Sequence, residues 1–186
     1  MERNRIVFSG SGGQGVITAS IILAEAAVLH EGINAIQSQS YGPEARGGAT
    51  RADVIISESE IHFPKVLQPN TLICLTQTAF NKYYTILRPG GVLVTDVHFV
   101  KTNKELDARR YELPIYDMVM ERIGKPVVFN IAVLGVLTGL LELVKLESIQ
   151  KVLVNRIPKD FLEMNNKALE LGYDLGCKAR NSRLAA

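Results

Sequence analysis

The sequence predicts an α/β domain of three αβα layers, in which a mostly parallel sheet lies between helices on its two faces. Short apolar runs alternate with segments of helical period along the 186 residues. A glycine-rich turn separates the first apolar run from the first helical segment. The composition, 47% hydrophobic and 22% charged, is that of a globular chain long enough to bury a sizeable core.

The first forty residues predict a Rossmann-like βαβ unit. Residues 6–8 form a short apolar run that stops at glycines, which is typical of a buried parallel strand. Residues 16–30 carry apolar side chains at helical spacing, and Gly32 follows them as a C-terminal breaker. A second apolar segment over residues 33–36 completes the unit, whose crossover is expected to be right-handed.

The rest of the chain continues the alternation of strands and helices. Residues 41–50 contain three glycines and one proline, so they predict an irregular loop. The β-branched run over residues 51–57 predicts a strand that forms a hairpin with residues 61–63. Further strands are expected over residues 71–75, 92–95 and 111–113. Helices are expected over residues 79–87, 116–123, 130–144, 146–154 and 160–171.

Glycines and one asparagine give further detail in the last helices. Asn130 stands at the start of a long apolar run and is expected to be its N-cap. Gly135 and Gly139 lie four residues apart on this helix, which is apolar on nearly all sides. We expect this pair of glycines to permit close packing against a neighbouring element. The final amphipathic helix is expected to end at Gly172.

Charge and cysteine content exclude several classes of function. With 21 Lys and Arg against 19 Asp and Glu, the net charge of +2 does not indicate a nucleic-acid-binding protein. Cys74 and Cys177 lie far apart without a C-x-x-C motif, so neither an iron–sulfur cluster nor a structural zinc nor a disulfide framework is expected. No signal peptide and no membrane span are expected, which predicts a cytoplasmic chain. We expect one domain over residues 1–176 and a basic, frayed tail over residues 177–186.

Residues 10–15 (GSGGQG) match the pattern G-x-G-x-x-G and lie between the first predicted strand and helix. Glycines allow the backbone to approach a ligand closely, and a helix N-terminus offers free N–H groups to a phosphate. The alternative is a glycine turn that only connects strand to helix. A self-contained NAD(P)-binding enzyme would carry an acidic residue about 20 positions later. Residues 34–40 contain no Asp or Glu. This argues against an NAD(P)-binding enzyme and also against an S-adenosylmethionine-binding enzyme.

A second polar loop follows the second predicted strand. In a parallel sheet, the loops that leave the carboxyl ends of neighbouring strands open into one crevice. The loop that begins at Tyr41 is therefore expected to face the glycine loop, and it brings Glu44 and Arg46. An arginine there suits a phosphorylated ligand or a carboxylate of another chain, with Arg51 nearby. Alternatively, Glu44 and Arg46 pair with each other on a solvated loop.

No catalytic set is visible elsewhere in the sequence. His30, His62 and His98 are scattered without triad or metal-ligand spacing. Cys74 lies in an apolar run and is expected to be a small core residue. We therefore expect neither catalytic residues nor a metal site within this chain, as in one part of a larger enzyme. A regulatory nucleotide-binding module without chemistry is a further alternative.

Two motifs together resemble the gamma subunit of 2-oxoacid:ferredoxin oxidoreductases. They are residues 10–16 (GSGGQGV) and residues 40–48 (SYGPEARGG). The resemblance covers roughly residues 3–175. It extends to Asn130, Leu134, Gly135, Glu163 and Asn165.

The resemblance implies a domain within a multi-subunit enzyme that has alpha, beta and in some cases delta subunits. Such enzymes decarboxylate a 2-oxoacid on thiamine diphosphate, pass electrons through iron–sulfur clusters to ferredoxin and transfer the acyl group to coenzyme A. Thiamine diphosphate and the clusters belong to partner subunits, so no activity is expected from this chain alone. The motif YGPEARGG is most similar to that of 2-oxoglutarate enzymes. Enzymes for pyruvate and for branched-chain 2-oxoacids are the alternatives.

The resemblance also associates the gamma subunit with the coenzyme A side of the active site and with subunit contacts. The candidate residues for these roles are those of the two matching loops. They are Gly10, Gly12, Gly13, Gln14, Gly15, Tyr41, Gly42, Glu44, Arg46, Gly47 and Gly48.

Overall fold

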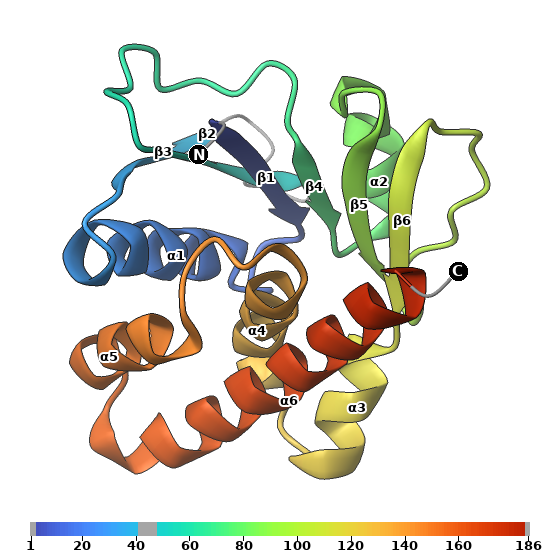
Figure 1. The fold of residues 1–186 in the computed structure, drawn as a ribbon. Coiled ribbons are helices and arrows are strands. Elements are labelled where there is room, and N and C mark those ends of the chain that lie inside the picture. Colours follow the sequence, from blue (N-terminus) through green and yellow to red (C-terminus); the bar gives the residue numbers. More distant parts are fainter. Residues whose placement is uncertain (1–2, 41–47, 185–186) are drawn as a thin grey trace.

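A six-stranded sheet with the order β2-β3-β1-β4-β5-β6 forms the centre of the computed structural model, which describes residues 3–40 and 48–184 (Figure 1). Its strands are β1 (Asn4–Gly10), β2 (Asn34–Ser40), β3 (Thr50–Ser57), β4 (Thr71–Cys74), β5 (Gly91–Asp96) and β6 (Ala108–Leu113). The helices are α1 (Val16–His30), α2 (Gln77–Tyr83), η2 (Tyr84–Ile86), α3 (Ile115–Arg122), η3 (Pro126–Val128), α4 (Phe129–Leu141), α5 (Leu146–Arg156) and α6 (Lys159–Leu184).

The helices cover the two faces of the sheet unequally. Side chains alternate along β1, so that Ile6 and Phe8 pack in one hydrophobic cluster and Val7 packs in the other. The first cluster also holds the buried faces of α1, α3, α4, α5 and α6, which lie together on one side of the sheet (Figure 1). Helix α2 and part of the connection over residues 58–70 cover the opposite side. The predicted three-layer α/β class is confirmed.

Strand β3 lies between the two strands of the expected βαβ unit. It pairs antiparallel with both β1 and β2, whereas β1, β4, β5 and β6 pair parallel in sequence. Strands β1 and β2 therefore run in the same direction but are not neighbours, unlike the first two strands of a Rossmann unit. The sheet is mostly parallel, as expected, and the carboxyl ends of β1, β2, β4 and β5 share one edge.

The expected hairpin between residues 51–57 and 61–63 is wrong. Both edges of β3 are already paired, one with β1 and the other with β2, so no edge stays open for a third strand. Residues 58–70 instead form a long connection without a strand, and it crosses to the start of β4 (Figure 1).

Helix α6 continues through Gly172 to Leu184, so the expected end at Gly172 is wrong. Residues 177–184 of the expected tail lie within this helix. The reason is its contact with α4. A Cβ atom on Gly172 would lie 2.0 Å from the carbonyl oxygen of Ala132, and one on Gly135 would lie 2.1 Å from that of Leu169. Gly139 and Gly176 make similar contacts, so the two helices touch backbone to backbone. The expected close packing at Gly135 and Gly139 is confirmed.

This contact predicts that Gly172→Ala destabilises the chain. Alanine favours an isolated helix, but here its methyl group would meet the backbone of α4 and force the helices apart. We expect the free energy of unfolding in urea to fall by about 2 kcal/mol. Gly12→Ala is the matched control, because no heavy atom of the described residues lies within 4 Å of a Cβ built there. Equal stability of the two variants would contradict the packing argument.

A buried ion pair fastens the connection over residues 58–70 to the sheet. Arg51 Nε lies 2.6 Å from Asp53 Oδ1, and Arg51 Nη2 lies 2.9 Å from Asp53 Oδ2. Their side chains are only 17% and 8% exposed. Arg51 also donates to the carbonyl oxygen of Val66 at 2.5 Å, while the Val66 N–H donates to Asp53 at 3.2 Å. The pair therefore fixes the middle of the connection, where Val66 is buried.

Asp53→Ala should destabilise the chain strongly, because it leaves the Arg51 guanidinium largely buried without its carboxylate. We expect a loss of about 3 kcal/mol in urea denaturation. The double variant Arg51→Ala/Asp53→Ala should lose less than Asp53→Ala alone. The control is Asp117→Ala, which removes a pair with His98 whose side chains are 45% and 56% exposed and should cost under about 1 kcal/mol. A smaller loss in Asp53→Ala than in the control would contradict this role.

Candidate functional site

The glycine loop leaves the carboxyl edge of the sheet at the end of β1. Gly10 lies opposite Thr50, the first residue of β3, and the backbone of Ser40 at the end of β2 lies opposite Arg51. The second predicted loop therefore departs from the same edge, one strand away from the first. Its residues Tyr41, Gly42, Glu44, Arg46 and Gly47 lie outside the described residues.

The far end of the second loop is fixed from the α2 side. Gly48 lies in a bend directly before the buried residue Ala49. The hydroxyl of Tyr83, on α2, donates to the carbonyl oxygen of Ala49 at 3.3 Å. Both flanks of the second loop are thus held at the edge from which the glycine loop departs.

Gln14 closes the glycine loop. Its Oε1 accepts the N–H of Ser11 at 2.8 Å, and its Nε2 donates to the carbonyl oxygen of Leu75, after β4, at 3.2 Å. A Cβ atom on Gly10 would lie 2.6 Å from the same Gln14 Oε1. Gly10 therefore leaves room for the side chain of Gln14, and Gln14 ties the loop to the adjacent strand. Both predicted site residues shape the loop.

The other three glycines of the loop differ in what the fold requires of them. Gly13 and Gly15 have φ angles of 88° and 69°, in the left-handed region that favours glycine. A Cβ atom on Gly15 would also lie 2.5 Å from Asn130 Nδ2. Gly12 has neither a positive φ nor, among the described residues, a heavy atom within 4 Å of the position that a Cβ would take. The fold itself therefore does not require a glycine at position 12.

Helix α1 begins directly behind this loop. Its N-cap is Gly15, and no side chain among the described residues caps the first turn, which contains no acidic residue. The first N–H groups of a helix lack partners within the helix, and its dipole is positive at this end. The loop and the start of α1 together present donors and partial positive charge, which suit an anionic group such as a phosphate.

Asn130 supports the loop from α4. Its Nδ2 donates to the carbonyl oxygen of Gly15 at 3.4 Å. The expectation that Asn130 caps its own helix is wrong: α4 begins at Phe129 with Val128 as N-cap, so Asn130 lies within the first turn and faces the loop. Sequence reasoning found the residue but not its partner, because Gly15 is 115 positions away in the sequence.

An apolar pocket of about 240 Å³ lies beside Asn130. Besides Asn130, it is lined by Thr18 at the start of α1 and by Phe161 and Asn165 of α6, among others. Asn165 is buried, and its Nδ2 donates to the Phe161 carbonyl oxygen at 2.8 Å. Glu163, on the same helix, is exposed. The residues that extend the sequence resemblance beyond the two loops therefore include two that line this pocket.

A carboxylate at the end of β5 was not among the candidate residues. Asp96 is fully buried and accepts the N–H groups of His98 at 2.8 Å and Tyr116 at 2.7 Å. Burial raises the pKa of this carboxyl group, while the two N–H donors lower it. The sequence feature that could have indicated Asp96 is its position at the end of a predicted strand, two residues before His98. Asp96 therefore holds the turn after β5 against the start of α3, which follows β6.

Two other predicted polar residues are structural. Arg51 is engaged by Asp53 and Val66, so its guanidinium is directed into the fold and not towards a ligand. Cys74 is buried, and burial raises the pKa of its thiol to about 12. This confirms Cys74 as a core residue. Within the described part of the chain, no group of three or more His, Cys, Asp or Glu residues could hold a metal ion.

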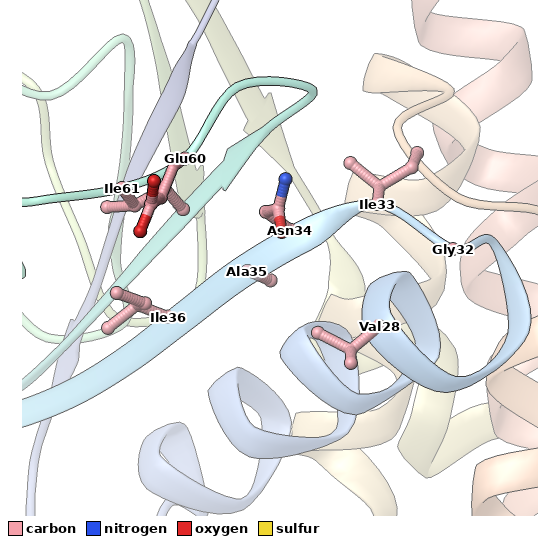
Figure 2. Close-up of a pocket in the computed structure, with 8 residues that line it drawn as sticks. All are labelled: Val28, Gly32, Ile33, Asn34, Ala35, Ile36, Glu60 and Ile61. Atoms are coloured by element: carbon pink, nitrogen blue, oxygen red, sulfur yellow. The ribbon is translucent and has the colours of Figure 1, made fainter.

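A separate hollow of about 350 Å³ lies at the amino end of the edge strand β2. Figure 2 shows Glu60 and Ile61, which follow β3, on one side of β2, and Val28 of α1 on the other. None of the candidate site residues lines it. Across the residues that the structure describes, no helix is long and apolar enough to cross a bilayer.

Comparison with known proteins agrees with this geometry. Residues 5–175 match the model of the pyruvate ferredoxin/flavodoxin oxidoreductase family. The 2-oxoglutarate synthase subunit KorC of Methanocaldococcus jannaschii is 44% identical, over 93% of this chain and 94% of its own length. KorC of Archaeoglobus fulgidus is 37% identical, over 97% of this chain and 92% of its own length.

Solved structures show the same fold. The gamma subunit of the keto/oxoacid ferredoxin oxidoreductase from Geobacter sulfurreducens superimposes with a TM-score of 0.85 at 38% identity, and the match covers 94% of this chain and 99% of that one. The 2-oxoglutarate:ferredoxin oxidoreductase from Magnetococcus marinus, at 19% identity and a TM-score of 0.86, shares the fold over 96% of this chain and 32% of its own. This chain thus belongs to the pyruvate ferredoxin/flavodoxin oxidoreductase family, as a gamma subunit of a 2-oxoacid:ferredoxin oxidoreductase.

Proposed function

We propose that this gamma subunit serves a 2-oxoglutarate:ferredoxin oxidoreductase. We further propose that its glycine edge, the carboxyl edge of the sheet from which the loop over residues 10–15 departs, contacts coenzyme A beside the partner subunits. The reaction converts 2-oxoglutarate and coenzyme A to succinyl-coenzyme A and CO₂, and an electron pair passes to ferredoxin. Relatives named as 2-oxoglutarate synthase subunits, at 37–44% identity, support the choice of 2-oxoacid. A pyruvate synthase subunit, PorC, is 28% identical.

The observation that carries the coenzyme A role is the open space that the described residues leave around Gly12. Four of the five candidate residues in this loop have a structural reason: Gly10 makes room for Gln14, Gln14 closes the loop, and Gly13 and Gly15 have left-handed backbones. Gly12 has none, yet it lies exposed before the uncapped start of α1. A glycine that the fold does not need is explained by close approach of a ligand, and the N–H groups of α1 suit a coenzyme A phosphate.

The remaining chemistry belongs to groups held by partner subunits. Thiamine diphosphate would form the bond to the 2-oxoacid, and iron–sulfur clusters would carry the electrons. We infer alpha, beta and, in enzymes that have one, delta subunits as partners, with ferredoxin reached through the complex. In this division of labour the gamma subunit orients coenzyme A for acyl transfer.

Gly12→Val tests the coenzyme A role in the assembled enzyme. Among the described residues, no heavy atom lies within 4 Å of a Cβ built at position 12, so we expect assembly and stability to be unchanged. We expect the KM for coenzyme A to rise about tenfold or more, in line with the loss of a hydrogen bond to a charged group, with 2-oxoglutarate as substrate and a viologen as acceptor. Asn155→Val, on the exposed side of α5, is the control. An unchanged KM would refute close approach at Gly12.

Arg46→Ala tests the second loop, whose flanks lie at the same edge. If Arg46 holds a coenzyme A phosphate, the variant should lose about 1.5–3 kcal/mol of binding or transition-state stabilisation. Arg46→Lys should restore this only in part, because an ammonium lacks the planar fork of a guanidinium. A raised KM with intact assembly supports the ligand role, and dissociation on gel filtration supports contact with a partner subunit. Unchanged kinetics and unchanged assembly would exclude both roles.

A further inference from the structure

A groove lies at the amino edge of the sheet, at the opposite end of the strands from the glycine loop. Its volume is about 570 Å³. It forms where the start of β1, the connection before β4 and the turn before β5 meet. Its lining residues are Arg5, Phe63, Lys65, Leu67, Gln68 and Arg88.

Hydrogen bonds of the backbone and of the Asn70 side chain fix the three segments that frame the groove. The N–H of Arg5 donates to Asn70 Oδ1 at 2.9 Å, and the N–H of Asn70 donates back to the Arg5 carbonyl oxygen at 2.8 Å. The N–H of Arg88 donates to the carbonyl oxygen of Pro69 at 3.2 Å. Together with the hold of Arg51 and Asp53 on Val66, these bonds preorganise the segment that carries Phe63, Lys65 and Leu67.

The side chains of this segment alternate between burial and exposure. Val66 and Pro69 are buried against the sheet. Between and before them, Leu67 is 73% exposed and Phe63 is 56% exposed. A single exposed apolar residue is ordinary, but here two large ones are held in a fixed frame. Preorganisation lowers the entropy cost of binding, so a fixed apolar pair is suited to contact with another protein.

The charge of the groove selects the chemistry of what it binds. Three of the lining residues are cationic, Arg5, Lys65 and Arg88, and within the described residues no carboxylate lines it. Arginine and aromatic side chains are enriched at protein interfaces. A complementary surface would therefore carry carboxylates around one or more apolar side chains.

We propose that this groove docks an acidic segment of another subunit of the oxidoreductase. The proposal rests on the proposed function for the identity of the enzyme, and it concerns a different edge of the sheet. Carboxylates of the segment meet Arg5 and Lys65, while its apolar side chains pack on Phe63 and Leu67. Docking here leaves the glycine edge open to its ligand.

The test uses the enzyme assembled by co-expression of its subunits, captured through a tag on this chain. The variant Lys65→Glu/Leu67→Ser reverses one charge and removes one apolar contact at exposed positions. Its capture of the other subunits should fall more than about tenfold at physiological salt, because like charges would face each other. Wild-type capture should weaken as NaCl is raised.

The matched control is Lys151→Glu/Val154→Ser on α5, which makes the same chemical changes at exposed positions on the other side of the sheet. Both variants should melt near the wild-type temperature, and the control should retain capture. Full capture by the groove variant would overturn the proposal. Two other outcomes would also overturn it. If the groove variant changed only the self-association of this chain, the occupant would be a second copy. If it changed only the binding of inorganic pyrophosphate to the groove, the occupant would be a small anion. Turnover of 2-oxoglutarate by the captured wild-type complex reports separately on the proposed function.

Discussion

The backbone contact between α4 and α6 positions the candidate site. Because Gly135 and Gly172 lack side chains, α4 lies against α6 at a distance that no other residue pair would allow. Helix α4 in turn carries Asn130, which donates to the carbonyl oxygen of Gly15. The glycine loop is thus held from the sheet by Gln14 and from the helical layer by Asn130. A change in the spacing of α4 and α6 would be transmitted to this loop.

Within the six residues of the glycine loop, the demands of the fold are distinct from those of the proposed ligand contact. Gly10 and Gly15 are required because Gln14 and Asn130 occupy the space that a Cβ would need. Gly13 is required by its left-handed φ angle, whereas Gly12 has neither a positive φ nor a described neighbour within 4 Å of a Cβ position. The sequence alone cannot distinguish a glycine that the fold requires from a glycine that a ligand would require, because the residue is the same in both cases. The distinction depends on what surrounds each Cα atom.

The sequence predicted the layers, the glycine loop and the close packing at Gly135, because these depend on local composition and period. It did not predict that β3 lies between β1 and β2, since strand order is decided by pairing between distant segments. It also placed a helix end at Gly172, because glycine destabilises an isolated helix. That local preference is outweighed by the contact with α4, which only the tertiary structure contains.

Arg51 lies near one edge of the sheet, but its side chain binds the connection that leads to the other edge. It lies beside the glycine edge, opposite Ser9 and the backbone of Ser40, where an arginine would suit a phosphate. Its guanidinium is instead taken by Asp53 and by the carbonyl oxygen of Val66, in the connection that leads to the basic groove. At the edge from which the glycine loop departs, the uncapped start of α1 still presents partial positive charge. The pair of Arg51 and Asp53 thus stabilises the connection at the opposite edge, and the proposed ligand contact and the proposed docking would depend on other charges.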